Sequence, residues 1–169
     1  MPIITTDIKF YLSGGAANAD VDASLGGVIS SEEITTATLH NLFDVVSSAE
    51  TSAGDIEYRC IYVKNTHGSL TLTDAAAWIS ANTPSADTNA DIGLGSGAVN
   101  TTEQTVADES TAPSAVSFSA PANQGAGLSI GDIPPGEHKA IWIRRTVSAA
   151  ASAYSNDSMT VNVGGDTAA

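Results

Sequence analysis

The chain of 169 residues is long enough for one domain with a full hydrophobic core, and short for two. Nineteen Asp and Glu residues stand against six Lys and Arg residues, which gives a formal net charge of −13. A charge of this sign repels nucleic acid and anionic lipid, so it argues against both as direct partners. Aromatic residues make up only 5% of the chain, so the large core side chains are few.

Residues 1–30 are expected to form an N-terminal arm with two short strands. Residues 7–12 alternate apolar and polar side chains, with Ile8 and Phe10 on the apolar side. A loop rich in Gly, Ala, Asn and Asp follows, and residues 25–30 favour a second short strand. Because residues 7–12 have no adjacent hairpin partner, we expect the N-terminal segment 1–12 to pair with the sheet edge of a neighbouring subunit.

The first residues show no basic region followed by a long apolar run, so no signal peptide is expected and synthesis in the cytosol is predicted. No stretch approaches 18 continuous apolar residues. Further along, Ser31 is followed by two acidic residues, as at the start of a helix, and apolar residues then recur at roughly helical intervals. This pattern predicts one short helix within residues 32–44, although three threonines weaken it.

The stretch from 56 to 80, IEYRCIYVKNTHGSLTLTDAAAWIS, contains much of the potential core. It predicts two adjacent strands joined by a turn at residues 65–69. A second dense stretch at 138–147, HKAIWIRRTV, has the same character. Each stretch carries one tryptophan, and we expect Trp78 and Trp142 to lie in the core. The single cysteine, Cys60, rules out an intramolecular disulfide and is expected to be a small buried apolar side chain.

The remaining pattern is of short strands separated by turns. Asp-Ile-Pro-Pro-Gly at 132–136 is a strong turn signal, and the last six residues, 164–169, are expected to be frayed. Further short strands are expected at 91–97 (as an edge strand), 116–118, 128–130 and 158–163. The sequence therefore predicts one all-β domain spanning 1–169: an antiparallel two-sheet β-sandwich of immunoglobulin-like or jelly-roll type, with at most one short helix and extended loops or arms.

Most of the basic residues lie in the two dense stretches. If those strands are neighbours, their positive charges form one patch on an acidic body. Such a patch either pairs with nearby carboxylates or contacts an acidic partner. Together with the apolar residues of the first strand, these basic residues are the predicted interface: Arg59, Lys64, Arg144, Arg145, Ile8 and Phe10.

Recognisable catalytic or metal-binding motifs are not found. NADVD at 18–22 resembles the start of a calcium loop but lacks the required Gly and Glu further on. GLGSG at 93–97 lacks the lysine and the following helix of a phosphate loop. The three histidines are far apart and no G-x-S-x-G occurs. We therefore expect no enzyme activity, no catalytic residue, no metal and no cofactor, while a cation site built from loop carboxylates stays open: Asp87 with Asp91, or Asp108 with Glu109.

IEYRCIYVKNTHGSLTLTDAAAWIS and the later LSIGDIPPGEHKAIWIRRTVSAAA resemble the β-sandwich virion proteins of tailed bacteriophages, and more narrowly the decoration, or cement, proteins of phage heads. The shared features, within residues 56–163, are a strand ending in V-K-N-T, a Pro-Gly turn and an aromatic-rich strand. The resemblance implies a homo-oligomer, with a trimer favoured, that is made in the host cytoplasm. It implies binding to the major capsid protein on the capsid exterior and reinforcement of the shell without chemistry.

Two alternatives stay open. A tail, collar or fibre component of the same virion has the same composition and differs only in where it binds. A carbohydrate-binding β-sandwich module needs solvent-facing aromatic side chains. With both tryptophans expected in the core, Tyr11 and Tyr154 are the candidates for that role.

Overall fold

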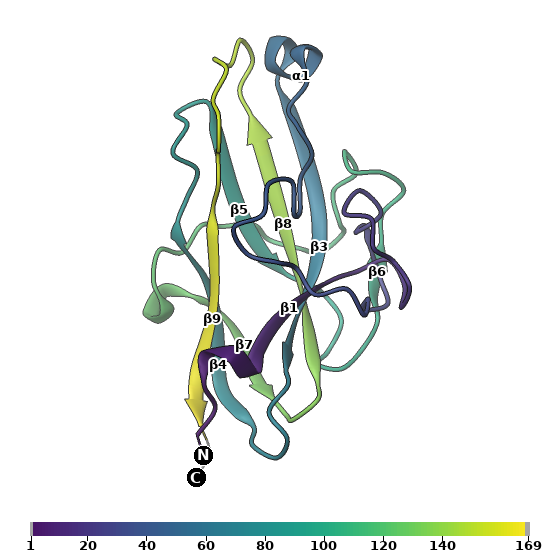
Figure 1. The fold of residues 1–169 in the computed structure, drawn as a ribbon, viewed down its shortest axis with the longest axis vertical. Coiled ribbons are helices and arrows are strands. Elements are labelled where there is room, and N and C mark those ends of the chain that lie inside the picture. Colours follow the sequence, from purple (N-terminus) through teal and green to yellow (C-terminus); the bar gives the residue numbers. More distant parts are fainter. Residues whose placement is uncertain (1, 168–169) are drawn as a thin grey trace.

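The computed structural model describes residues 2–167 and is an all-β sandwich of antiparallel sheets, as the sequence predicts (Figure 1). The four-stranded sheet contains, in spatial order, β1 (Ile8–Leu12), β3 (Asp55–Asn65), β8 (His138–Val147) and β5 (Thr88–Leu94). The three-stranded sheet contains β7 (Leu128–Ile133), β4 (Leu72–Ala81) and β9 (Thr160–Thr167). A short ribbon pairs β2 (Gly26–Gly27) with β6 (Glu103–Thr105). No helix among the described residues is long and apolar enough to cross a membrane.

The four-stranded sheet is the middle layer because β3 and β8 are apolar on both faces. In β3, Ile61 and Val63 belong to the main core cluster shared with the three-stranded sheet. Cys60 and Tyr62 belong to a second cluster on the opposite face, with the fully buried Trp142 of β8. Residues of the long loops cover this second cluster: Ile29, Val106, Val116 and Phe118. The expectation that Cys60 is a buried apolar side chain is confirmed.

The predicted hairpin of residues 56–80 is wrong, because β3 and β4 lie in different sheets. The turn between them is a crossover held by Asn65, whose side chain is fully buried. Its Nδ2 donates to the carbonyl oxygens of Leu70 and Ile133, at 2.8 and 2.9 Å. The Pro-Gly turn crosses between the sheets in the same way, from β7 to β8, and the Gly136 N–H donates to the Asn65 carbonyl. One buried amide therefore joins both crossovers.

The N-terminal strand finds its partner within the chain, which contradicts the expected pairing with a neighbouring subunit. β1 runs antiparallel to β3, with Ile8 opposite Asn65 and Leu12 opposite Ile61. Its outer edge is also occupied, because residues 30–34 hydrogen-bond to it through the backbone. Ile8 and Phe10 are half-buried against the main core. Met1 lies outside the described residues.

The expected helix at 32–44 is absent, and the α-helix found within residues 2–167 is α1 (Ser48–Ala53). The start signal at Ser31 fails because residues 30–34 bond to the edge of β1 instead. One of the apolar residues that follow, Leu42, is buried in the main core, and the segment that carries it is an irregular loop. Ser47 supplies the cap of α1, and its side chain and Glu50 form a capping box. Two single 3-10 turns complete the helical elements of the described part of the chain: Thr5–Asp7 and Gln124–Ala126.

Several strand boundaries also differ from the sequence prediction, and the strands expected at 91–97, 128–130 and 158–163 are β5, β7 and β9 with other bounds. The stretch 25–30 contributes only β2, and 116–118 forms no strand, although Ser119 bridges to Ile92 at the outer edge of β5. The edge position of β5 is confirmed. The expected frayed tail is wrong over 164–167, which complete β9 because β4 pairs with them; residues 168–169 lie outside the described part. Trp78 is only half-buried, on the outer face of the three-stranded sheet.

A bulge in the central strand β4 explains the glycines at the end of β9. β4 advances three residues, from Thr73 to Ala76, while β9 advances two, from Asp166 to Gly164. The bulged segment of β4 contains Asp74, whose φ is 50°. The bulged backbone lies so close to Gly165 that a Cβ there would be 2.5 Å from the Thr73 carbonyl oxygen.

We predict that Gly165→Ala lowers the free energy of unfolding by about 2 kcal/mol or more, because neither backbone can move without breaking the β4–β9 ladder. Gly68→Ala is the matched control, since a Cβ at Gly68 meets nothing within 4 Å. We expect its effect to stay within about 0.5 kcal/mol. Urea denaturation of both variants measures the difference, and equal stabilities would contradict the close contact.

Candidate functional site

The predicted basic patch does not form, although β3 and β8 are neighbours as expected. Strand alternation places Arg59 and Arg145 on the face toward the three-stranded sheet. Lys64 and Arg144 lie on the opposite face, where Arg144 is paired with Tyr58, six residues from Lys64. Six residues of strand span about 20 Å. The predicted interface residues are therefore distributed over two faces and both ends of the sheet.

Arg59 is fully buried and pairs with carboxylates from two separate loops. Its Nη2 lies 3.0 Å from Asp22 Oδ1 and 2.5 Å from Glu109 Oε2. The same two loops also bond to β3 through their backbones. The Tyr58 N–H donates to the Glu109 carbonyl, and the Cys60 N–H donates to the Ser24 carbonyl. The sequence left two roles open for the basic residues: pairing with nearby carboxylates or contact with an acidic partner. Arg59 has the first of these roles. A fully buried guanidinium is not available to a partner.

A second buried pair lies beside it. The Glu57 carboxylate, 1% exposed, accepts hydrogen bonds from the guanidinium of Arg145. Arg145 also donates from Nη1 to the Asp44 carbonyl, at 2.8 Å. The ring of Phe43 packs under both guanidiniums, with its centroid 5.5 Å from Arg59 Cζ and 4.8 Å from Arg145 Cζ. Burial raises the pKa of Glu57 to about 7, against the lowering effect of Arg145 and Arg59.

Two further cations are also bound within the chain. Arg144 donates from Nε and Nη2 to Asp91 Oδ2, at 3.1 and 2.6 Å, and its Cζ lies 5.1 Å from the Phe118 ring centroid. Lys139 is 9% exposed and donates from Nζ to the carbonyl oxygens of Gly95 and Gly97. Burial lowers the pKa of Lys139.

The glycine-rich loop at 93–97 binds an anion that belongs to the chain itself. The buried carboxylate of Glu103 accepts hydrogen bonds from the N–H groups of Ser96 and Gly97, at 3.1 and 2.9 Å. A Cβ at Gly95 would be 2.2 Å from Glu103 Oε2. Burial acts to raise the pKa of Glu103, but these hydrogen bonds outweigh it, so the pKa is lowered. The lack of a side chain at Gly95 thus lets the Glu103 carboxylate come close to the loop backbone.

The loop carboxylates that stayed open as a cation site have partners of their own. Asp87 accepts from the Ser152 N–H, and Asp108 from the Thr111 hydroxyl. Asp91 and Glu109 are paired with Arg144 and Arg59. Within residues 2–167, the structure shows no group of three or more His, Cys, Asp or Glu side chains placed to hold a metal ion.

Register brings together a group that the sequence does not reveal. Lys9 of β1 lies opposite Lys64 of β3, and Lys64 lies opposite His138 of β8. We call these three residues the cationic row, after the charges of its two lysines. Lys9 pairs with Glu33 at 2.7 Å, while Lys64 has no ion-pair partner among the described residues and lies 5.9 Å from the Tyr11 ring centroid. Burial, followed by the charge of Lys64, lowers the pKa of His138.

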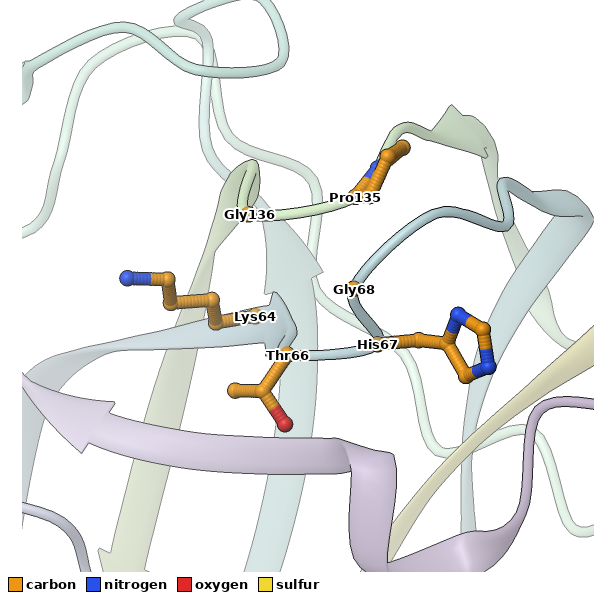
Figure 2. Close-up of a pocket in the computed structure, with 6 residues that line it drawn as sticks. All are labelled: Lys64, Thr66, His67, Gly68, Pro135 and Gly136. Atoms are coloured by element: carbon orange, nitrogen blue, oxygen red, sulfur yellow. The ribbon is translucent and has the colours of Figure 1, made fainter.

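A shallow hollow adjoins the row where the two crossover turns meet, lined by Lys64, Thr66, His67, Gly68, Pro135 and Gly136 (Figure 2). Figure 2 shows the side chains of Lys64 and His67 pointing in opposite directions. His67 Nδ1 accepts from the Leu70 N–H at 3.0 Å, so it is engaged within its own turn. The hollow therefore gives no convergent set of groups around a small ligand, and Lys64 presents its charge outward.

Of the six predicted interface residues, Lys64 is thus the one that keeps a free charge. Lys9 and His138 were not predicted, because they lie 55 and more residues from Lys64 and only strand register aligns them. No protein-family model, curated protein or solved structure matches this chain.

The pKa of Glu57 predicts a pH dependence of stability. A carboxyl whose pKa is higher in the folded state binds its proton more tightly there, so it stabilises the fold below its unfolded pKa. This contribution is lost as pH rises from about 4.5 to about 7. We expect the stability difference between wild type and Glu57→Gln to change by at most about 3 kcal/mol across this interval. Urea denaturation across this pH range measures it, and a constant difference would contradict the shift.

Proposed function

We propose that this protein is a non-enzymatic virion structural protein that binds the outer surface of a phage capsid and stabilises it. The observation that carries the proposal is the cationic row, which lies on a chain of net charge −13. In this row Lys9 is paired with Glu33, and the unpaired charge of Lys64 on an acidic body fits docking onto an acidic patch of a larger assembly. The proposed partner is the major capsid protein, and the proposed location is the capsid exterior.

The row is suited to orienting the protein as it docks. A surface ion pair contributes roughly 0.2–1 kcal/mol, so affinity would come from many weak contacts across repeated capsid sites. Charge complementarity also steers association and suppresses the wrong orientation, since the rest of the surface is repelled by an acidic partner. Both effects weaken with salt, because the Debye length falls from about 10 Å at 0.1 M to about 3 Å at 1 M.

The remaining cations support a rigid body behind this row. Arg59, Arg144 and Arg145 are paired with carboxylates of the chain, and Lys139 is bound to carbonyl oxygens. The contacts of Arg59 and Lys139 fasten loops to the four-stranded sheet, while those of Arg144 and Arg145 join neighbouring strands within it. A decoration protein reinforces a shell by bridging its subunits, and a firmly fastened body transmits that constraint.

Carbohydrate binding is the second candidate, and one observation favours it. Trp78 is half-exposed on the outer face of the three-stranded sheet, close to Gly164. Trp78 thus adds a partly solvent-facing ring to Tyr11 and Tyr154, the candidates that the sequence offers for sugar binding. A tail, collar or fibre position fits the same cationic row and differs in the particle to which it binds.

Co-sedimentation with isolated phage heads, compared with isolated tails, tests the proposal. We expect saturable binding to heads that weakens with salt. Lys64→Ala should weaken this binding severalfold by removing the free charge of the row. Ser129→Asp is the control: it changes the net charge by the same amount at an exposed position of β7, so its binding should stay close to wild type.

Binding to tails alone would move the protein to the tail, collar or fibre class. Binding to neither particle, with retention on a glycan array that Trp78→Ala abolishes, would favour the carbohydrate-binding module. Equal loss of head binding in Lys64→Ala and Ser129→Asp would show that net charge, and not the cationic row, controls docking.

A further inference from the structure

The two sheets have four outer strands, and the chain itself blocks or distorts the edges of three. Residues 30–34 bond to the outer edge of β1, and Ser119 bridges to the outer edge of β5. β7 is interrupted, since its register against β4 shifts on either side of Ala75 and Gly131 has a φ of 84°. Bulges and covering segments are the usual protection of a sheet edge.

β9 has none of this protection. Its register shifts against β4 place the extra residues in β4, so β9 itself is regular over its eight residues. The strand, TVNVGGDT, has no Pro or Lys, and Asp166 is its one charged residue. Within residues 2–167, β4 is the one strand that pairs with it. Figure 1 shows β9 as the long yellow strand.

The main core is also less fully covered beside β9 than beside its neighbour β4. Its inward-facing residues Val161 and Val163 belong to the fringe of the main core cluster and are half-exposed. Their partners in β4, Ile79 and Ala77, are 3% and 0% exposed. The open edge thus presents both free backbone groups and apolar side chains, which is what an added strand would cover.

We propose that this edge binds the β9 strand of a second copy of the chain, antiparallel, about a two-fold axis at Val163. The two three-stranded sheets then form one continuous six-stranded sheet. This self-association surface goes beyond the proposed function and does not depend on it. An antiparallel pairing of a strand with its own copy is isologous, so the same backbone groups and side chains meet from both sides.

The choice of Val163 follows from pairing rules. Directly opposed residues of an antiparallel pair lie on the same face, so the axis must pass through a residue. An axis at Val163 opposes two β-branched side chains, a favourable cross-strand pair. It also places the two Asp166 carboxylates six residues apart, or about 20 Å. An axis at Gly164 opposes two glycines and brings the carboxylates to about 13 Å.

Charge explains why a second copy is compatible with a chain of net charge −13. The general repulsion between two acidic bodies is long-range and is screened by salt. The proposed contact itself holds one carboxylate per strand, at the end of the pairing. Dimerisation should therefore strengthen as salt is raised, which is opposite to the salt dependence expected for capsid binding.

Sedimentation velocity of the full chain over a wide range of concentration, together with a cysteine cross-link, tests the proposal. In Val163→Cys the two thiols face each other across the axis, with Cα atoms about 5 Å apart, which suits a disulfide. In the control Val161→Cys the two positions are four residues apart, about 13 Å, which is too far. The native Cys60 is fully buried and does not compete.

We expect a concentration-dependent dimer in the wild type, and a disulfide-linked dimer under mild oxidation in Val163→Cys but not in Val161→Cys. When reduced, both variants should associate as the wild type does, which checks that they fold. A wild type that is monomeric throughout would overturn the proposal. So would a dimer or trimer in which Val163→Cys fails to cross-link, because another surface would then hold the copies together.

Discussion

The buried guanidinium of Arg59 is the constraint on which the rest of the structure depends. It lies in β3, the strand that is covered on both faces, and it has no contact with solvent. A charge in such a place is tolerated only when carboxylates neutralise it, and removing one member of a buried pair costs about 3–5 kcal/mol. Asp22 and Glu109 come from two long loops, so both loops must reach the edge of β3 for the fold to form.

The same requirement organises the backbone. β1 pairs with β3 from Asn65 to Ile61 and then ends, which leaves the next N–H groups of β3 without a strand partner. Carbonyl groups of Ser24 and Glu109 take over at Cys60 and Tyr58. Loop residues then cover the outer face above Trp142. The same long loops therefore supply both the carboxylates that pair with Arg59 and the side chains that cover the second core cluster.

Because most of the cationic side chains are bound within the fold, few positive charges remain for contacts with a partner. With the three arginines and Lys139 bound within the chain and Lys9 paired with Glu33, the half-buried Lys64 keeps the one unpaired lysine or arginine charge among the described residues. The apolar contact surface lies elsewhere, at the edge of β9. The docking by charge and the self-association by strand pairing that we propose would thus use different sheets of the sandwich, and opposite responses to salt would separate them in experiment.

The sequence predicts strands well where the pattern is local. His138–Val147 matches β8 at both ends, because its apolar run is bounded by a Pro-Gly turn and a loop of small residues. Sheet membership was not predictable in the same way: a turn such as 65–71 joins two strands of one sheet or crosses between sheets, and the buried contacts of Asn65 decide it. The frayed tail was wrong for a similar reason, since the two glycines are required by a bulge in β4 that has no local signal.

The candidate site was less predictable still. Clustered basic residues indicated a patch, but alternation placed Arg59 and Lys64 on opposite faces of one strand. Lys9, Lys64 and His138 become neighbours through the register of three strands, and no spacing in the sequence encodes that register.

Hydrogen exchange of the amides in an Arg59→Met variant tests the central claim most directly. Met keeps much of the side-chain volume but removes the charge, so Asp22 and Glu109 lose their common partner. We predict that the loops around residues 20–25 and 106–111 lose protection together, while β4 and β9 keep theirs. Unchanged protection in both loops, or a uniform loss across both sheets, would contradict the claim that Arg59 fastens these two loops to β3.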